Sequence, residues 1–467
     1  RIPWLEGYSK AATSGGWSPT SVELVGLSLI AGGKAEEAIA MLDAAVARYP
    51  EDPWLQVVLG NALHHAKQGR AALRCFAAAV ALQPESAMLR VHLGDAFIRA
   101  GRTERAMPEY ERAIELDPKL VRGYVGIALV HLDARQFDAM VPVLEQAVEA
   151  DPEDTIPHWL LGDAYIHLEQ FVAAEQSLER AVELAPHNAA AWRRLGELHL
   201  YYTRRYDDAA KAYDEAVILR PLSGQSWRDL GASCMWAGRY DEALKALGEA
   251  EALVPDDVLV AVYTGRTHWF RQDFASAYPY LKRALAAGST QIPPGYDELA
   301  KRLGALQPNL GAMRRGEYEP KTPREWVDFG DLFYEIKEYA ASTRAYRKGY
   351  ALDPSIPVVP AKGRRYNAAC AAALAGSGEG TDANGLTADE RRGFRDQART
   401  WLEAELLVLR RQLANGQLTK PAFEAWMKHW LGDKDLTGVR DEGGLALDES
   451  EREAWAGLWT EVRGAAK

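Results

Sequence analysis

The sequence predicts an all-α protein in which helical hairpins stack one after another into a solenoid. Three observations support this prediction. The chain has 467 residues, which is too long for one compact globule. Prolines recur at a spacing of 34 residues, with a single interval of 35, and the same order of small and large apolar residues precedes each of them. These prolines are Pro50, Pro84, Pro118, Pro152, Pro186, Pro221 and Pro255.

Each interval between these prolines contains a skeleton that we interpret as two helices. Glycine and alanine let neighbouring helices approach closely, and large apolar side chains fill the space beside them. The proline ends the second helix because it lacks an N–H group and clashes with the preceding turn. One hairpin cannot bury its apolar face alone, whereas stacked hairpins share a continuous core. Three of the units contain Trp192, Leu195, Gly196, Ala209, Tyr213, Ala216 and Pro221; Trp227, Leu230, Gly231, Ala243, Leu247, Ala250 and Pro255; and Leu93, Gly94, Phe97, Gly101, Ala106, Tyr110, Ala113 and Pro118.

This skeleton resembles the tetratricopeptide repeat (TPR), whose pattern is W-x2-L-G-x2-Y…A-x3-F…A…P. The resemblance covers eight units from about Pro19 to Gln291, and then one more. It implies a right-handed TPR superhelix, an α-solenoid of about nine to ten helical hairpins with a helical C-terminal cap. It also implies a protein-interaction scaffold rather than an enzyme.

The predicted organisation follows the chain in order. It consists of an N-terminal lead-in at 1–18, eight TPR units at 19–291, an irregular linker with a helix at 292–322, a ninth unit at 323–356, a modified hairpin at 357–415 and a helical cap at 416–467. In the linker we expect a helix over Tyr296–Leu306 and irregular structure after it. In the fourth unit Ala128 replaces glycine and Met140 replaces alanine, which predicts a looser junction. The sixth unit has one extra residue, which we place in its turn near Tyr201–Arg205.

A glycine-rich string near residue 380 has the local look of a phosphate-binding loop. Its glycines are Gly376, Gly378 and Gly380. They follow a predicted helix, however, whereas phosphate loops precede a helix and hold the anion at its N-terminus. We therefore predict that Tyr366–Leu374 is the first helix of a tenth hairpin. Gly376–Gly385 is then a mobile, enlarged turn before the second helix.

The C-terminal block carries a more distinctive pattern, "RRYNAACAAALAG", "ERRGFRDQARTWLEAEL", "HWLGDKDLTGVRD" and "LDESEREAWAGLWTEV". From about Tyr339 onward it resembles the TPR tails of Hanks-type serine/threonine protein kinases of planctomycete-type bacteria. The resemblance implies a kinase-linked tail that docks partners or substrates, with any catalytic domain upstream of Arg1, or a stand-alone relative. The alternative is a free-standing TPR adaptor in envelope, secretion or complex assembly.

Three short motifs resemble catalytic or ligand-binding sites, but each lacks the other residues that such a site requires. Asp328-Phe329-Gly330 spells the magnesium-binding triplet of kinases, but Phe329 and Gly330 occupy two packing positions of a repeat, and no other kinase element is in register. "AGGKA" at 31–35 lacks the first glycine and the Ser or Thr of a P-loop. His64 and His65 point about 100° apart on a helix and lack further ligands. We predict no catalytic, cofactor-binding or metal-binding residues; an unrecognised enzymatic site in the C-terminal block is a third alternative.

Composition narrows the class of partner. The formal net charge of −11 argues against nucleic acid, because neutralising phosphates needs a basic face. No apolar run approaches the roughly 18 residues that span a bilayer. The cysteines, Cys75, Cys234 and Cys370, are far apart and odd in number, which favours a reducing compartment such as the cytoplasm. The oligomeric state stays open, since exposed solenoid ends can stack.

A protein or peptide partner is expected on the concave face. In the TPR family this face is lined by positions 2, 5, 9 and 12 of the first helices, to which we add position 13. Arginines recur there in three consecutive units with aromatic residues nearby; arginine forks bind carboxylates or carbonyls, and aromatic faces bury apolar side chains. The predicted peptide-binding groove comprises Trp159, Asp163, Arg193, Glu197, Tyr201, Arg228, Trp236, Arg266, Trp269 and Phe270.

Three other interpretations of this face are an ion-paired surface without a ligand, a carboxylate clamp and an asparagine ladder. The same arginines are able to pair with Asp163 or Glu197 while the aromatic residues pack into adjacent helices. The carboxylate clamp that grips chaperone C-termini is not expected, because Asn61 matches but Val57 stands where its lysine belongs. The asparagine ladder of sugar-transferase repeats is also missing apart from Asn61.

Overall fold

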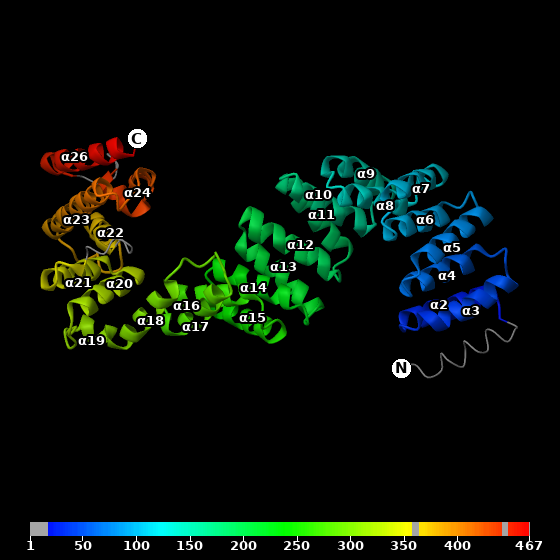
Figure 1. Cartoon of the computed structure of the whole chain (residues 1–467), viewed down its shortest axis with the longest axis horizontal. Helices are drawn as coiled ribbons and strands as arrows, with labels where there is room; N and C mark the ends of the chain where they lie inside the picture. The colour runs from blue at the N-terminus through cyan, green and yellow to red at the C-terminus, as the bar shows by residue number, and fades with distance from the viewer. Residues whose placement is uncertain (1–16, 357–363, 441–446, 467) are drawn as a thin grey trace. The chain divides into compact units, whose positions relative to one another are not determined.

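The computed structural model describes residues 17–356, 364–440 and 447–466, and all regular secondary structure in these ranges is helical. The chain divides into two compact units (Figure 1). Unit 1 comprises Arg1–Arg239 and Gly248–Val254, and unit 2 comprises Tyr240–Leu247 and Pro255–Lys467. The predicted lead-in at 1–18 lies almost wholly outside the described residues, as do 357–363 of the modified hairpin and 441–446 of the cap.

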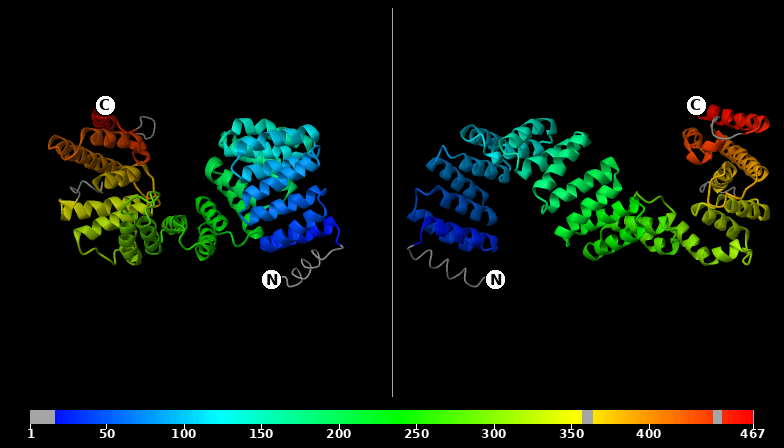
Figure 2. Two further views of the ribbon diagram at one scale, coloured as in Figure 1. Left: turned by 45° about the vertical axis from the view of Figure 1, so that its right-hand side comes forward. Right: turned by 180° about the vertical axis from the view of Figure 1, so that it is seen from behind.

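Unit 1 is a row of helical hairpins, in which each helix as far as Gly224–Trp236 packs on the next along the chain (Figures 1 and 2). The predicted all-α stack of hairpins is thereby confirmed. The helices are α2 (Pro19–Ala31), α3 (Ala35–Arg48), α4 (Pro53–His65), α5 (Gly69–Leu82), α6 (Ala87–Arg99), α7 (Thr103–Leu116), α8 (Val121–Asp133), α9 (Phe137–Ala150), α10 (Thr155–His167), α11 (Phe171–Leu184), α12 (Ala189–Glu197), α13 (Tyr206–Leu219), α14 (Gly224–Trp236) and α15 (Tyr240–Leu253), whose residues fall in both units.

The repeating prolines stand at the junctions between hairpins. Two residues after Pro50, the Asp52 carboxylate accepts hydrogen bonds from the backbone N–H groups of Trp54 and Leu55, at 2.9 and 3.3 Å, and caps α4. A polar cap follows most of the other prolines at the same distance. The proline therefore ends one helix while a side-chain oxygen satisfies the first N–H groups of the next. These further caps are Ser86, Asp154, Asn188, Ser223 and Asp257.

Close contacts at glycine hold the two helices of a hairpin together. A Cβ atom added at Gly162 would lie 2.4 Å from the Leu178 side chain, and one at Gly94 would lie 2.7 Å from Tyr110. Tyr110 also packs against Gly126 of the following unit, where an added Cβ atom would lie 2.4 Å from the tyrosine ring. A methyl group at these positions would push the helices apart.

The extra residue of the sixth unit lies in a helix, which corrects its predicted place in the turn. Leu198–Thr203 forms a π-helical turn, η1, directly after α12, and Arg204 then adopts a left-handed φ of 56°. A π-turn absorbs one additional residue without breaking the backbone hydrogen-bond ladder. The hairpin therefore keeps its packing while the last residues of its first helix are rotated.

Unit 2 continues the hairpins and then changes. Its helices are α16 (Val258–Phe270), α17 (Phe274–Ala286), α18 (Tyr296–Leu306), η2 (Gln307–Asn309), α19 (Leu310–Arg314), α20 (Pro323–Glu335), α21 (Tyr339–Leu352), α22 (Arg364–Ser377), α23 (Ala388–Ala414), α24 (Lys420–Gly432), η5 (Lys434–Leu436), α25 (Thr437–Arg440) and α26 (Glu449–Ala465). The helix expected over Tyr296–Leu306 is α18, with the same bounds. The segment after it is not wholly irregular, because it contains η2 and α19.

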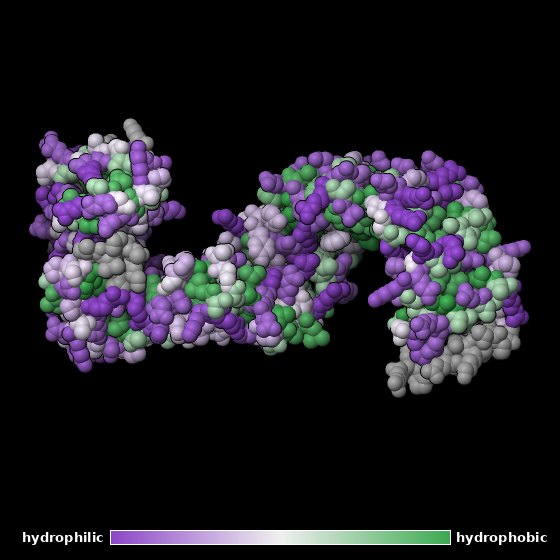
Figure 3. All heavy atoms as spheres, in the orientation of Figure 1, coloured by the Kyte–Doolittle hydropathy of each residue, from purple (hydrophilic) through white to green (hydrophobic). Residues whose placement is uncertain are grey.

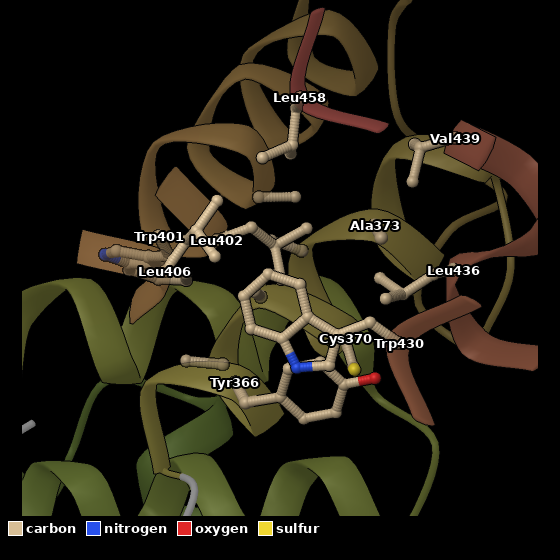
Figure 4. Packing of buried hydrophobic residues seen from close by; sticks show 14 of the residues in the cluster. Tyr366, Cys370, Ala373, Trp401, Leu402, Leu406, Trp430, Leu436, Val439 and Leu458 are labelled. Carbon is tan, nitrogen blue, oxygen red and sulfur yellow. The ribbon is translucent and has the colours of Figure 1, made fainter. Parts of the chain in front are cut away.

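The small-residue helix α22 lies at the centre of the C-terminal block. Figure 4 shows Tyr366 and Cys370 of α22 beside Trp430 of α24, and the Tyr366 and Trp430 rings stack at 5.3 Å. The Tyr366 hydroxyl donates a hydrogen bond to Asp433 at 2.7 Å. Alanines along α22 are fully buried, which allows α23 to pack closely along it.

The glycine-rich turn between α22 and α23 is tied to α21. Helix α22 extends to Ser377, three residues beyond its predicted end, and Gly378 and Gly380 adopt positive φ angles of 82° and 101°. Asp382 accepts hydrogen bonds from the backbone N–H groups of Ala340 and Ala341, at 3.3 and 2.8 Å. The turn was expected to be mobile, but its carboxylate caps the N-terminus of α21.

We predict opposite effects of alanine at two helical glycines. Gly162→Ala places a methyl group against Leu178 and lowers the free energy of unfolding by about 1–3 kcal/mol. Gly248→Ala, in α15, meets no atom within 4 Å and raises it by about 0.5–1 kcal/mol, because alanine favours the helix. Equilibrium denaturation of both variants measures the difference; shifts of the same sign would contradict the packing role of Gly162.

A second prediction concerns the ion pair that fixes the C-terminal block. Arg395 donates to both carboxylate oxygens of Glu451, at 2.9 and 3.1 Å, and to the Gly376 carbonyl at 2.8 Å, in a buried environment. Glu451→Ala leaves this guanidinium buried without its counter-ion and destabilises unit 2 by about 3 kcal/mol. The matched control is Glu461→Ala, which breaks an exposed pair with Arg410 and changes stability by less than about 1 kcal/mol. Equal thermal shifts in the two variants would rule out the special role of Arg395.

Candidate functional site

The first helices of unit 1 carry a connected set of ion pairs. We call the surface made by α10, α12, η1 and α14 the first-helix face. On it, Asp163 of α10 accepts from Arg194 of α12, which also contacts Glu197 at 2.7 Å. Arg193 lies 3.7 Å from the same Glu197. Asp163, Arg193 and Glu197 were predicted as groove residues and are brought together here.

Arg194, which joins these residues, was missed by sequence reasoning. It follows Arg193 directly and is largely buried between Asp163 and Glu197. The double arginine was the available signal, but the repeat pattern assigns only the first of the two to the groove. The pairing of Asp163 with an arginine therefore uses Arg194, and Arg193 remains the more exposed of the two.

A second cluster lies at the junction of η1 and α14. Arg228 donates from Nε to Asp229 at 2.8 Å, and the Tyr201 hydroxyl donates to the same carboxylate at 3.4 Å. Burial raises the pKa of Asp229, and the hydrogen bonds from Arg228 and Tyr201 oppose that rise. Arg228 is mostly buried, whereas the Tyr201 ring stays 47% exposed. Arg228 thus positions Asp229, and Tyr201 offers the accessible surface.

The predicted groove residues of unit 2 are engaged with their own unit. Arg266 donates to the Gln291 carbonyl at 3.2 Å. Trp269 packs edge-on against Phe274 at 5.1 Å and lies 5.0 Å from the Tyr296 ring, beside a buried cluster. Phe270 remains exposed. Of these three, Phe270 presents an accessible apolar surface.

Aromatic pairs, two stacked and two tilted, join successive hairpins, and the sequence did not predict these particular contacts. In each pair, a residue near the end of a first helix meets the first residue of the preceding second helix. In unit 1 the pairs are Phe137 with His167 at 4.1 Å, Phe171 with Tyr202 at 5.5 Å and Tyr206 with Trp236 at 6.0 Å; in unit 2 Tyr240 meets Phe270 at 6.2 Å. Spacings of 34 and 35 residues within each series were the available signal. Such contacts stabilise by about 0.5–1.5 kcal/mol, so Trp236 and Phe270 also hold the stack together.

The motifs that suggested chemistry take part in packing and ion pairs within the fold. Phe329 is fully buried, a Cβ added at Gly330 would lie 2.7 Å from Tyr346, and Asp328 pairs with Arg302 and Arg324, so the predicted packing role of Phe329 and Gly330 is confirmed. His64 has a lowered pKa because of burial and the nearby Arg99. Within the described ranges, no three His, Cys, Asp or Glu residues gather in a way that suits a metal ion, and no helix has the length and apolar character needed to cross a membrane.

Family models for the tetratricopeptide repeat match residues 29–92, 68–120, 125–189, 168–221, 198–258 and 235–292, more than half of the chain. The chain belongs to the tetratricopeptide repeat family. TPR proteins are generally non-catalytic scaffolds for protein–protein interaction, and their partners are proteins. The repeat skeleton read from the sequence is therefore confirmed at the level of the family.

Individual relatives match shorter parts. A TPR repeat-containing protein of Methanocaldococcus jannaschii is 32% identical over 114 residues, which is 24% of this chain and 18% of the relative's length. Among solved structures, YrrB, described as a TPR protein with an unusual peptide-binding site, is 24% identical, with 40% of this chain and 95% of YrrB covered and a TM-score of 0.35. MamA is 22% identical, with 37% and 94% covered and a TM-score of 0.34. PilF of Pseudomonas aeruginosa is 17% identical, with 45% and 96% covered and a TM-score of 0.39.

Glu335, the hydrogen-bond partner of Trp269, leads to a prediction about how the stability of the protein depends on pH. Burial and the nearby Asp331 raise the pKa of Glu335 to about 7, opposed by a hydrogen bond from Trp269. The folded protein holds this proton between the unfolded pKa of 4.5 and about 7, so its stability falls as pH rises through this window, by up to about 3 kcal/mol. Denaturation midpoints measured across the window test this.

Glu335→Gln should flatten this dependence, because the amide does not ionise. The exposed Glu298→Gln serves as the matched control and should leave the slope unchanged. A Glu335→Gln protein with an unaltered pH profile would mean that Glu335 does not hold the proton.

Proposed function

We propose that this chain is a docking scaffold that binds an extended peptide of a partner protein along the first-helix face. The observation that carries the proposal is the exposure of two large aromatic side chains beside an arginine network. Tyr201, within η1, and Trp236, the last residue of α14, are 47% and 42% exposed. Aromatic and arginine residues contribute most often to binding hot spots, because they combine apolar area with directed hydrogen bonds.

The ion pairs give this face a fixed polar frame. Arg194 is held by two carboxylates, and Arg228 is held by Asp229. Arg193 contacts Glu197 at 3.7 Å, beyond ordinary hydrogen-bond length, so its guanidinium retains N–H donors for a peptide carbonyl or carboxylate. A rigid frame lowers the entropy lost on binding. We therefore assign Arg193, Tyr201 and Trp236 as the contact residues and the buried arginines as their supports.

The setting we propose is the docking tail of a bacterial serine/threonine protein kinase. It rests on the resemblance of the block from about Tyr339 onward, and the competing setting is a free-standing adaptor in envelope, secretion or complex assembly. The reading frame upstream of Arg1 separates them. VAIK, HRD and APE elements in that order support the kinase tail, and an upstream region of any other kind refutes it.

The docking proposal predicts which side chains a ligand touches. Peptides selected from a displayed random library on the whole chain should bind the Tyr201→Ser, Trp236→Ser double variant at least about tenfold more weakly, since about 1.4 kcal/mol of apolar contact is lost. Arg193→Glu should weaken the same peptides, and Tyr201→Phe should not, because it keeps the ring. Fluorescence anisotropy with the selected peptides measures each affinity.

The matched control is Ile218→Ser. Ile218 is also a large apolar residue and is 64% exposed, but it lies on the second helix α13. Thermal melts of all variants establish that they fold. Peptides that bind every variant alike, or that respond only to Ile218→Ser, would place the docking surface elsewhere.

A further inference from the structure

At one junction between neighbouring first helices, two apolar side chains occupy the positions that carry an ion pair in the preceding repeat. Arg122 of α8 contacts Asp95 of α6 at 3.0 Å, and these residues are 27 positions apart. Leu129 of α8 and Ile156 of α10 are also 27 positions apart, one repeat further on. Because successive hairpins repeat the same packing, they occupy the corresponding places. They are 41% and 50% exposed.

Residues beside this pair extend the apolar surface into the core. Val125 and Leu132 of α8 and Trp159 of α10 are partly buried and pack against one buried cluster. That cluster consists of Ala128, Met140, Leu144, Leu160, Leu161 and Ala164. Val125 and Leu132 lie about one helical turn on either side of Leu129, and Ile156 lies one turn before Trp159. We call Val125, Leu129, Leu132, Ile156 and Trp159 the apolar patch.

Ion pairs bound the apolar patch on both sides along the row of first helices. Asp95 and Arg122 precede it, and Asp163 and Arg194 follow it. An apolar centre with a polar rim is the usual anatomy of an interface, because the centre excludes water while the rim fixes orientation. Figure 3 shows hydrophobic residues scattered among hydrophilic ones over one face of unit 1. Trp159, predicted as a groove residue, lies in the apolar patch.

The charged residues in the sequence around the apolar patch are mostly acidic, which bears on the charge of the ligand that it can bind. Between Asp133 and His187 the sequence contains twelve Asp and Glu, two Arg and no Lys. Most of these carboxylates are exposed, and two of them adjoin the patch along the chain: Asp133, four residues after Leu129 at the end of α8, and Glu153, three residues before Ile156. Charges act over about 8–10 Å at moderate ionic strength, so a ligand on the patch experiences a negative potential. An acidic ligand would be repelled from this part of the face.

We infer that the apolar patch anchors an aliphatic or aromatic side chain of a peptide whose flanking residues are lysine and arginine. The inference rests on the proposed docking function and specifies its ligand class. The apolar side chain contacts Leu129, Ile156 and Trp159, and the flanking cations lie over the acidic repeats. Such a ligand satisfies both the shape and the charge of the surface.

The test uses the full chain and three fluorescein-labelled peptides of equal length. The first has two central leucines flanked by lysines; the second replaces the lysines by glutamates, and the third replaces the leucines by serines. Fluorescence anisotropy should show binding of the first peptide only, weakening as ionic strength rises from about 0.01 to about 0.15 M. The Leu129→Ser, Ile156→Ser double variant should bind it at least about tenfold more weakly.

Val172→Ser is the matched control, because Val172 is 72% exposed in the same acidic stretch but on the second helix α11. It should bind the first peptide as the parent chain does. Equal binding of the glutamate or serine peptide, no binding of the lysine–leucine peptide, or indifference to Leu129→Ser, Ile156→Ser would each overturn the inference.

The library-selected peptides show whether a negative result concerns the apolar patch alone or the proposed docking function as a whole. If they respond to Tyr201 and Trp236 substitutions but not to Leu129 and Ile156 substitutions, the scaffold stands and the apolar patch is not its anchor. If they respond both to the Tyr201 and Trp236 substitutions and to the Leu129 and Ile156 substitutions, and carry basic flanks, both assignments hold.

Discussion

The close approach of two helices at a glycine is the contact on which the rest of the structure depends. In unit 1, Phe76 packs onto Gly60, Tyr110 onto Gly94 and Leu178 onto Gly162, each from the second helix of the same hairpin. A side chain at the glycine would separate the helices and displace every later hairpin. Because the contact recurs, residues at equal positions of successive repeats become spatial neighbours, and the row of first helices has a defined spacing.

Because the hairpins stack with a regular spacing, residues about 30 positions apart in the sequence come into contact. Arg122 meets Asp95 and Arg194 meets Asp163 because each pair spans neighbouring first helices at that spacing. The π-turn η1 preserves the register while it takes up one extra residue, and Tyr201 at its surface remains within hydrogen-bond distance of Asp229. A longer loop would have absorbed the residue too, but it would not have held Tyr201 against the next helix.

The sequence was sufficient for the fold because its determinants are local and repeated. Small residues, large apolar residues and proline mark each hairpin, and α18 begins and ends at its predicted residues. The candidate site was less predictable. Whether Arg193 or Arg194 reaches Asp163 depends on side-chain direction around the helix, and the cap that Asp382 supplies to α21 joins residues about forty positions apart through a turn without a repeat pattern. The aromatic pairs were visible as spacings but not as contacts.

Differences between equivalent positions carry more functional information than the shared skeleton. The skeleton explains why the hairpins stack, and it is the same whether or not a ligand binds. An ion pair at one junction and an exposed Leu129–Ile156 pair at the corresponding place of the next cannot both be required by stacking, because the stack accepts either. Exposed aliphatic side chains between ion-paired neighbours gain their stabilisation when a ligand covers them. This departure from the repeat is therefore where we place the contact with the proposed partner.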